Sequence, residues 1–230
     1  QGSAKGITMQ MSHRSSVPVN TLKGSVLLIA FTLGSASLAS SPETPCAISS
    51  ETKLPFFGDL HIHTRYSFDS YLSNQKNDPD GAYEYAKGRV ITLPNAYGDQ
   101  TISAQIDRPI DFAAVTDHGQ FLGEVALCDS DWSHAAWWAP VCLMSRAQNL
   151  WIQLYAASLW TVSGGMDGKA PERGIVCALG DCETSALSVW GDIQAAAERH
   201  YDRSEDCSFT TFVGYEYTQG QEMANLHRNV

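Results

Sequence analysis

Three short apolar segments, far apart in the chain, each end in side chains that can bind a metal ion. They are residues 58–63 (GDLHIH), 114–118 (AVTDH) and 214–216 (GYE), and His227 follows the third segment. Parallel β/α proteins place their functional side chains at the carboxyl ends of their strands, along one edge of the sheet. The pattern therefore predicts an α/β protein in which these distant side chains meet at that edge.

The alternation of side chains predicts a strand in each segment. In residues 56–63 the apolar side chains fall on one face and the polar side chains, including both histidines, fall on the other. Residues 112–116 form a small-residue apolar run that is typical of a buried parallel strand. Residues 210–217 are predicted to form a third strand, in which Glu216 shares a face with Phe212.

The segments between these strands carry turn and helix signals. Asp78 is expected to cap a short helix over residues 81–87, and residues 89–107 are expected to form a small hairpin or loop. Residues 119–208 are too long for one ordinary crossover. Their apolar spacing predicts one helical face over residues 143–155 and a second helix over residues 189–201, capped by Thr184 or Ser185. The tryptophans of this region are expected to be mainly core residues.

The amino terminus has the layout of a secretory signal. A basic stretch leads into residues 26–34 (VLLIAFTLG), and the small residues 37–39 (SLA) offer a cleavage site before Ser40. The apolar run is shorter than the roughly 20 residues that span a bilayer. We therefore expect an exported protein, periplasmic or extracellular, with no stable membrane insertion after signal cleavage.

The chain has 6 cysteines, an even number that indicates disulfides in an exported protein. A zinc–cysteine site is the competing interpretation, but no Cys-x-x-Cys sequence occurs. Cys128 and Cys142 are predicted to pair because both lie in one loop-rich stretch, and proximity slightly favours a pair between Cys177 and Cys182. The partners of Cys46 and Cys207 stay open.

Composition restricts the class of protein and its partners. A hydrophobic share of 43% with 17% charged residues is typical of a globular chain. The formal net charge is -10, and so acidic a surface repels phosphate backbones. We therefore expect no nucleic-acid partner.

The residue types of the three segments favour divalent metal binding. His61 and His63 lie two positions apart on a strand, so both rings project to the same side, roughly 7 Å apart along the backbone. Two surface histidines are the simpler interpretation of that pair alone. Asp117 and His118 end the second strand, and Glu216 stands in an apolar run, where a carboxylate without a partner costs several kcal/mol. A bound cation would remove that cost.

Together, His61-Ile62-His63-Thr64, Thr116-Asp117-His118 and Gly214-Tyr215-Glu216, with the later His227, resemble the PHP (polymerase and histidinol phosphatase) superfamily of metal-dependent phosphoesterases. The closest resemblance is to a branch of long exported bacterial proteins catalogued mainly as a domain of unknown function, and it spans residues 56–230. It implies an α/β fold, a partial distorted TIM-like barrel with a helical, disulfide-bearing insert. The family's late Asp-x-His pair is absent, so we expect a C-terminally truncated fragment.

The resemblance also implies roles for particular residues. His61 and His63 would bind a first metal, Glu216 would bridge to a second that His227 also binds, and His118 and Asp69 would bind a third. Zinc, manganese or iron suits this set of ligands, with two or three ions per site. Glu216 and Asp117 would be catalytic, Asp117 by orienting His118. Arg65 and Arg228 are candidates for binding the substrate phosphate, although each is equally consistent with a solvated surface arginine.

These implications give an expected organisation and activity. The expected parts are a leader and signal peptide (residues 1–39), the first part of the barrel (40–118), an inserted helical subdomain (119–208) and a truncated barrel continuation (209–230). The expected activity is hydrolysis of a small-molecule phosphoester by a metal-activated water, weak or absent in the fragment alone. An amidohydrolase-type enzyme and a non-catalytic, metal-stabilised exported binding protein are the alternatives.

Overall fold

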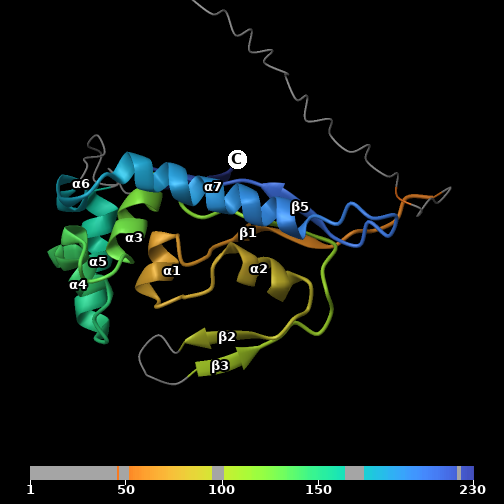
Figure 1. The fold of residues 1–230 in the computed structure, drawn as a ribbon, viewed down its shortest axis with the longest axis horizontal. Coiled ribbons are helices and arrows are strands. Elements are labelled where there is room, and N and C mark those ends of the chain that lie inside the picture. The colour runs from red at the N-terminus through yellow and green to blue at the C-terminus, as the bar shows by residue number, and fades with distance from the viewer. Residues whose placement is uncertain (1–45, 47–51, 95–100, 164–173, 222–223) are drawn as a thin grey trace, which may run out of the picture. The chain divides into compact units, whose positions relative to one another are not determined.

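A computed structural model describes residue 46 and residues 52–94, 101–163, 174–221 and 224–230. The predicted leader and signal peptide, residues 1–39, lie outside the described residues. The segment Pro42–Val230 forms one compact unit (Figure 1). Within the described part of the chain, no helix is both long and apolar enough to cross a membrane.

A three-stranded parallel sheet forms the base of the candidate site. Its strands are β1 (Gly58–Ile62), β4 (Phe112–Val115) and β5 (Thr210–Val213), in the order β1-β4-β5. The strands predicted over residues 56–63 and 112–116 are confirmed. Gly58 permits the close approach of β1 to β4, because a Cβ there would lie 2.3 Å from the backbone oxygen of Phe112.

The prediction of one continuous strand over residues 210–217 is wrong. The strand β5 ends at Val213, and a new strand, β6 (Glu216–Gln221), begins after a break and pairs antiparallel with β7 (Ala224–Asn229). Gly214 lies at the break, where a Cβ would come within 3.1 Å of the Val230 oxygen. Phe212 is 48% exposed whereas Glu216 is fully buried, so the two side chains do not share a face.

The start of β6 is tied to the carboxyl ends of the sheet strands by hydrogen bonds. The Glu216 N–H donates to the backbone oxygen of Asp117, just beyond β4, and the Asn229 amide donates to the backbone oxygen of Leu60 in β1. The β6–β7 hairpin therefore lies against the edge of the sheet where the polar segments end.

One face of the sheet packs against two helices. They are α2 (Pro79–Ala86) and α7 (Cys182–His200), and α7 runs along the sheet (Figure 1). The core between them includes Tyr83, Val115, Ile193 and Phe209. The Asp78 carboxylate accepts from the Gly81 N–H, which confirms the predicted cap. The cap of α7 is Asp181, which accepts from the Thr184 N–H, and not Thr184 or Ser185.

A two-stranded antiparallel hairpin follows α2, as the prediction for residues 89–107 allowed. It consists of β2 (Ile91–Pro94) and β3 (Thr101–Ala104). The remaining helices gather at one end of the unit (Figure 1). They are α1 (Phe68–Leu72), η1 (Gly119–Phe121), α3 (Leu122–Cys128), η2 (Ala135–Trp138), α4 (Pro140–Ser145), α5 (Leu150–Ser163) and α6 (Ile175–Leu179).

The single helical face predicted over residues 143–155 is wrong. The chain forms two helices there, because the Asn149 side chain accepts from the backbone N–H groups of Trp151 and Ile152 and starts α5 as a separate helix. Several of the apolar side chains assigned to a buried face are exposed, and so are three of the tryptophans expected in the core. The exposed residues include Leu143, Leu150, Leu154, Tyr155, Trp132, Trp138 and Trp151.

The chain contains three disulfides. The predicted pair Cys128–Cys142 is confirmed, and Cys177 pairs with Cys182, the partner that proximity slightly favoured. The third disulfide joins Cys46 to Cys207, across a sequence separation of 161. It ties the described amino-terminal cysteine to the loop that leads into β5.

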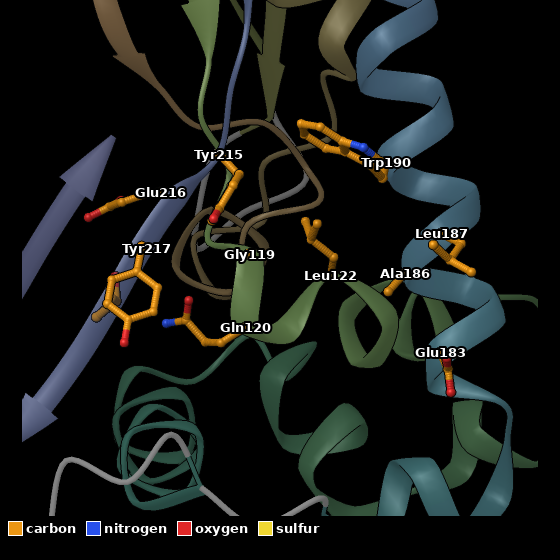
Figure 2. A pocket seen from close by; sticks show the side chains of 11 residues that line it. Gly119, Gln120, Leu122, Glu183, Ala186, Leu187, Trp190, Tyr215, Glu216 and Tyr217 are labelled. Carbon is orange, nitrogen blue, oxygen red and sulfur yellow. The ribbon is translucent and has the colours of Figure 1, made fainter. Parts of the chain in front are cut away.

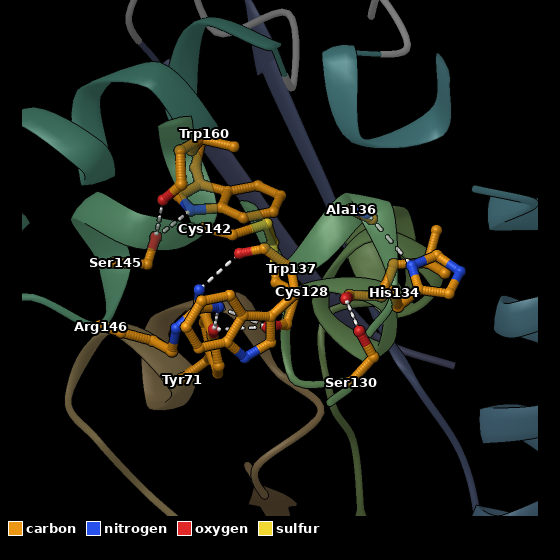
Figure 3. Close-up of a disulfide and its surroundings, with 12 residues drawn as sticks. Tyr71, Cys128, Ser130, His134, Ala136, Trp137, Cys142, Ser145, Arg146 and Trp160 are labelled. Atoms are coloured by element: carbon orange, nitrogen blue, oxygen red, sulfur yellow. Dashed lines mark hydrogen bonds between the residues drawn. A yellow bond between two sulfur atoms is a disulfide. The ribbon is translucent and has the colours of Figure 1, made fainter. Parts of the chain in front are cut away.

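Around Cys128–Cys142, hydrogen bonds connect the helical end of the unit to the site (Figure 3). The Arg146 guanidinium donates to the backbone oxygens of Cys128 and Trp137, and lies 4.1 Å from the centre of the Trp137 ring. It also donates to the Tyr71 hydroxyl at 3.1 Å. Tyr71 lies on α1, two residues after Asp69, so the disulfide region supports the helix that carries a predicted ligand.

The described residues form no closed barrel. They form a mixed α/β unit with a parallel sheet and a helical, disulfide-bonded region. The predicted α/β class and the disulfide-bearing helical insert are therefore confirmed, whereas a barrel is not seen among these residues. The long segment between β4 and β5 serves two purposes. Its last helix, α7, is the crossover that packs on the sheet, whereas α3 to α6 cluster beside α1.

Candidate metal centre

All six predicted metal ligands converge at the carboxyl edge of the sheet. β1 positions His61 and His63, the start of α1 positions Asp69, the end of β4 positions His118, and the β6–β7 hairpin positions Glu216 and His227. Their ligand atoms form three overlapping groups, each with all atoms within 4.8 Å of one another. The groups are His61, His63 and Glu216; His63, Asp69 and His118; and His118, Glu216 and His227.

Glu216 lies at the centre of this arrangement, and its side chain is 0% exposed. Its Oε2 lies 2.7 Å from Nε2 of His63, 3.2 Å from Nε2 of His61 and 3.5 Å from Nδ1 of His118. Its Oε1 contacts Nδ1 of His227. Burial alone would raise the pKa of Glu216, but the neighbouring charge of His118 and the hydrogen bond of His227 outweigh burial and lower it. These histidines therefore favour the ionised form of the buried carboxylate.

The His63 ring shows that these residues fit a bound cation. Its Nδ1 lies 2.9 Å from the Asp69 carboxylate, which can only accept, so Nδ1 carries the donated proton. Burial would lower the pKa of His63, but the hydrogen bond and charge of Asp69 raise it. Within the described residues Nε2 is buried and makes no hydrogen bond, although Oε2 of Glu216 is 2.7 Å away. In a protonated ring Nε2 would donate to Glu216, whereas in a neutral ring its lone pair and Oε2 of Glu216 could bind one cation together.

Asp69 holds a second part of the cluster. Its Oδ2 lies 3.5 Å from Nε2 of His118, and its Oδ1 accepts from the Ser67 hydroxyl at 2.6 Å. Burial would raise the pKa of Asp69, but hydrogen bonds from His118, His63 and Ser67 lower it well below its usual range. The histidines and Ser67 therefore favour the ionised form of Asp69.

Asp117 contacts a different residue from the one that the sequence suggested. We expected its carboxylate to orient His118, but it accepts from the backbone N–H of Thr64 at 2.5 Å and from the Thr64 hydroxyl at 2.7 Å. Burial raises the pKa of Asp117 to about 6, against the opposing hydrogen bonds from Thr64. Asp117 therefore fixes the turn that follows His63.

Three hydroxyl residues complete the site, and no role was predicted for any of them from the sequence. Thr218 lies 2.8 Å from Nδ1 of His118, Ser67 accepts from the His118 N–H at 3.3 Å, and Thr64 binds Asp117. Thr218 follows Glu216 by two positions on a strand, so the alternation of side chains would have placed it on the same face. No comparable signal identifies Ser67.

The two predicted substrate-binding arginines lie in different surroundings. Arg65 forms an ion pair with Asp129, donating from Nε at 3.0 Å and also from Nη2. Arg228 is exposed on β7, opposite Tyr217, on the strand face away from its neighbour His227. Of these two arginines, Arg65 is held in an ion pair and Arg228 is exposed to solvent on the β6–β7 hairpin.

Among the described residues, one further group of potential ligands lies outside the cluster and is not a metal site of the same kind. Glu124 lies close to Cys177 and Cys182. Both sulfurs are consumed by their disulfide, so neither can supply a thiolate.

Residues 50–230 match the model of a protein family that is described as "protein of unknown function (DUF3604)". The chain belongs to the DUF3604 family. No curated protein and no solved structure matches the chain. The DUF3604 match includes every residue of the cluster, from His61 to His227.

Proposed function

We propose that this DUF3604 chain is an exported metal-dependent hydrolase that cleaves small-molecule phosphoesters, with the chemistry and the partial distorted TIM-like barrel of the PHP superfamily. The observation that carries the proposal is the fully buried Glu216 carboxylate with four histidines and a second carboxylate gathered beside it. This donor set of imidazoles and carboxylates suits zinc, manganese or iron.

The three overlapping groups in the cluster would hold two or three ions, with Glu216 shared between two groups. Divalent ions held there would polarise a phosphoryl oxygen and acidify a water molecule. The chain's own contribution is a set of fixed ligands. The neighbouring histidines favour the ionised forms of Glu216 and Asp69, and Asp117 holds Thr64 so that the His63 ring keeps its position.

The surroundings of the two arginines argue against a direct contact with a phosphate held at the cluster. The Arg65 guanidinium is already paired with Asp129, so its role is to fix the loop after β1. Arg228 is exposed, but its side chain lies on the face of β7 away from the ligand His227. We therefore assign the contact with the substrate phosphate to the ions that the cluster would hold.

Three disulfides support export, because disulfides persist in oxidising compartments outside the cytosol. A net charge of -10 favours a small substrate over nucleic acid, since an acidic surface repels a polyanion, whereas metal ions bound at the cluster would attract a single phosphate.

The test is a panel of phosphomonoesters and phosphodiesters, assayed with Mn²⁺ or Zn²⁺ on the oxidised chain, where we expect weak or no hydrolysis, and on a longer product of the gene that carries the family's Asp-x-His pair. In the longer product we expect hydrolysis of at least one class, loss of activity on chelation, and a loss of more than about 100-fold in Glu216→Gln, because an amide cannot replace the shared charge. His134→Gln, which changes a histidine outside the cluster, is the matched control and should keep full activity. A Glu216→Gln variant that keeps full activity would contradict the proposed mechanism.

A further inference from the structure

A second group of ligand side chains lies where three helices meet, and it shares no residue with the cluster at the sheet edge. Glu124 on α3, Cys177 on α6 and Cys182 at the start of α7 place a carboxylate oxygen and two sulfurs within 4.8 Å of one another. The two sulfurs are joined in a disulfide, so the oxidised group cannot bind an ion. Reduction of this disulfide would place two thiols beside the carboxylate.

Close packing of α3 on α7 fixes the Glu124 carboxylate against the disulfide. At Gly123, its neighbour on α3, a Cβ would lie 2.0 Å from the backbone oxygen of Cys182. Glu124 is 4% exposed, and its Oε1 lies 3.2 Å from Sγ of Cys177. A disulfide sulfur has no proton to donate, so the oxidised pair gives this oxygen no hydrogen bond. The carboxylate is therefore already placed as a third ligand for an ion that two thiolates would hold.

The Cys177–Cys182 disulfide can be reduced at little cost to the fold. It closes a separation of 5 residues, against 14 and 161 for the other two disulfides, so its loss relaxes the unfolded chain least. Cys177 is partly exposed, whereas Cys128 and Cys142 are both 0% exposed. A reductant can therefore reach this pair from the Cys177 side while Cys128–Cys142 stays protected.

A dithiol reductant would open the pair in two exchange steps. One of its thiolates attacks the Cys177 sulfur, the S–S bond breaks, and Cys182 leaves as a thiolate that takes up a proton. The second thiol of the reductant then attacks the reductant's own sulfur in the mixed disulfide and releases Cys177. The reductant becomes a cyclic disulfide, and the cysteine pair gains two electrons and two protons. Metal binding afterwards displaces both thiol protons into water.

We propose that reduction of Cys177–Cys182 opens a second metal site, in which both thiolates and the Glu124 carboxylate bind one zinc ion. Thiolate ligands select Zn²⁺ over harder ions, and three protein ligands leave a fourth position for water. The Cα atoms of the two cysteines are 5.2 Å apart, so both sulfurs can reach one ion at the zinc–sulfur distance of roughly 2.3 Å. The site is independent of the proposed hydrolase function, because none of its ligands belongs to the cluster around Glu216.

The first test detects the metal–sulfur bond itself, with Co²⁺ as the probe. A chain reduced with dithiothreitol and freed of reductant under argon should show a sulfur-to-cobalt charge-transfer band on titration with Co²⁺, and Zn²⁺ should displace it. The oxidised chain should show no band, because the histidine cluster offers only nitrogen and oxygen ligands. A double variant, Cys177→Ser with Cys182→Ser, should show no band after the same treatment, since the other four cysteines lie outside the group.

The second test concerns the carboxylate ligand. Glu124→Gln should weaken Co²⁺ binding at the thiolate site by at least about tenfold, since even an outer partner of a metal ligand contributes that much. Glu183→Gln is the matched control and should bind normally. Glu183 follows Cys182 on α7 but is exposed and lines the pocket beside that helix, outside the ligand group (Figure 2).

Glu124→Asp keeps the charge but withdraws the oxygens by one methylene, so it should also weaken binding, and it replaces Glu124→Gln if urea unfolding shows that the latter is not folded. No charge-transfer band in the reduced wild-type chain, or a band that persists in the double cysteine variant, would overturn the proposal. Wild-type affinity in a folded Glu124 variant would overturn it as well, because the carboxylate would then not be a ligand.

Discussion

The buried carboxylate of Glu216 needs a positive partner, and the surrounding side chains restrict what that partner can be. Protonated histidines could supply the charge, but the His61–His63 and His63–His118 ring centroids are each 4.8 Å apart. Several imidazolium ions at this spacing would repel one another. A divalent cation gives the same compensation with neutral rings, so the geometry favours a metal ion over a set of protonated histidines.

The ligands could be predicted from the sequence, but their supports could not. His61, His63, His118 and Glu216 each lie at or near a strand end, and strand ends of a parallel sheet meet at one edge. The hydrogen-bond partner of Asp117 depends on how the turn after β1 packs against the end of β4, and no local sequence pattern predicts this contact. The hydrogen bonds to Thr64 therefore emerge only from the three-dimensional structure.

Thr64→Val tests the support of this turn. The change removes the hydroxyl that donates to Asp117, leaving a buried carboxylate oxygen without that donor. We expect a loss of about 1–3 kcal/mol in the free energy of unfolding, measured by urea denaturation, and about tenfold weaker metal binding. Thr64→Ser keeps the hydroxyl and is the control. Equal stability and metal affinity of the two variants would show that the hydroxyl does not hold the turn.

At the scale of helices and strands, close approaches position the parts of the site. The crossing of α3 and α7 is so tight that a Cβ at Gly123 would lie 2.0 Å from the backbone oxygen of Cys182. This crossing connects the disulfide-bonded helices to the helix that covers the sheet. Side-chain spacing was enough to predict which segments form strands and which form helices. It did not predict the break after Val213 or the start of α5 at Asn149, because the first depends on tertiary contacts and the second on a capping side chain.

Gly123→Ala should therefore destabilise the protein by about 1–3 kcal/mol, because α3 and α7 must separate to admit the methyl group. Gly191→Ala is the matched control on α7, where a Cβ would meet nothing within 4 Å. That variant should be neutral or up to about 1 kcal/mol more stable, since alanine is the better helix former. Denaturant unfolding of both variants measures the difference, and equal stabilities would contradict a tight crossing.

On the scale of the whole molecule, three disulfides restrain segments of very different length. Cys46–Cys207 closes a separation of 161 residues, whereas Cys177–Cys182 closes 5. Sequence proximity predicted Cys128–Cys142 but left the other four cysteines open, with only a slight preference for Cys177–Cys182. The long-range pair was not assigned, because it depends on where the loop before β5 meets Cys46.

Removing the long-range disulfide should cost more stability than removing the short one. The chain-entropy relation gives about 5 kcal/mol for Cys46–Cys207 and about 2 kcal/mol for Cys177–Cys182, since the longer loop restricts the unfolded chain more. Double Cys→Ser variants of each pair, compared by denaturant unfolding under oxidising conditions, test this order. The reverse order would mean that strain or residual structure outweighs loop closure.

The metal content of the purified, oxidised chain tests the central claim most directly. After loading with Zn²⁺ or Mn²⁺ and removal of free ions, elemental analysis should find at least about one divalent ion per wild-type chain, as the donor set predicts. His134→Gln should bind as much metal as the wild type, and Glu216→Gln should lose most of it. A wild-type chain without bound metal, or a Glu216→Gln variant that retains the full amount, would contradict a metal centre built around Glu216.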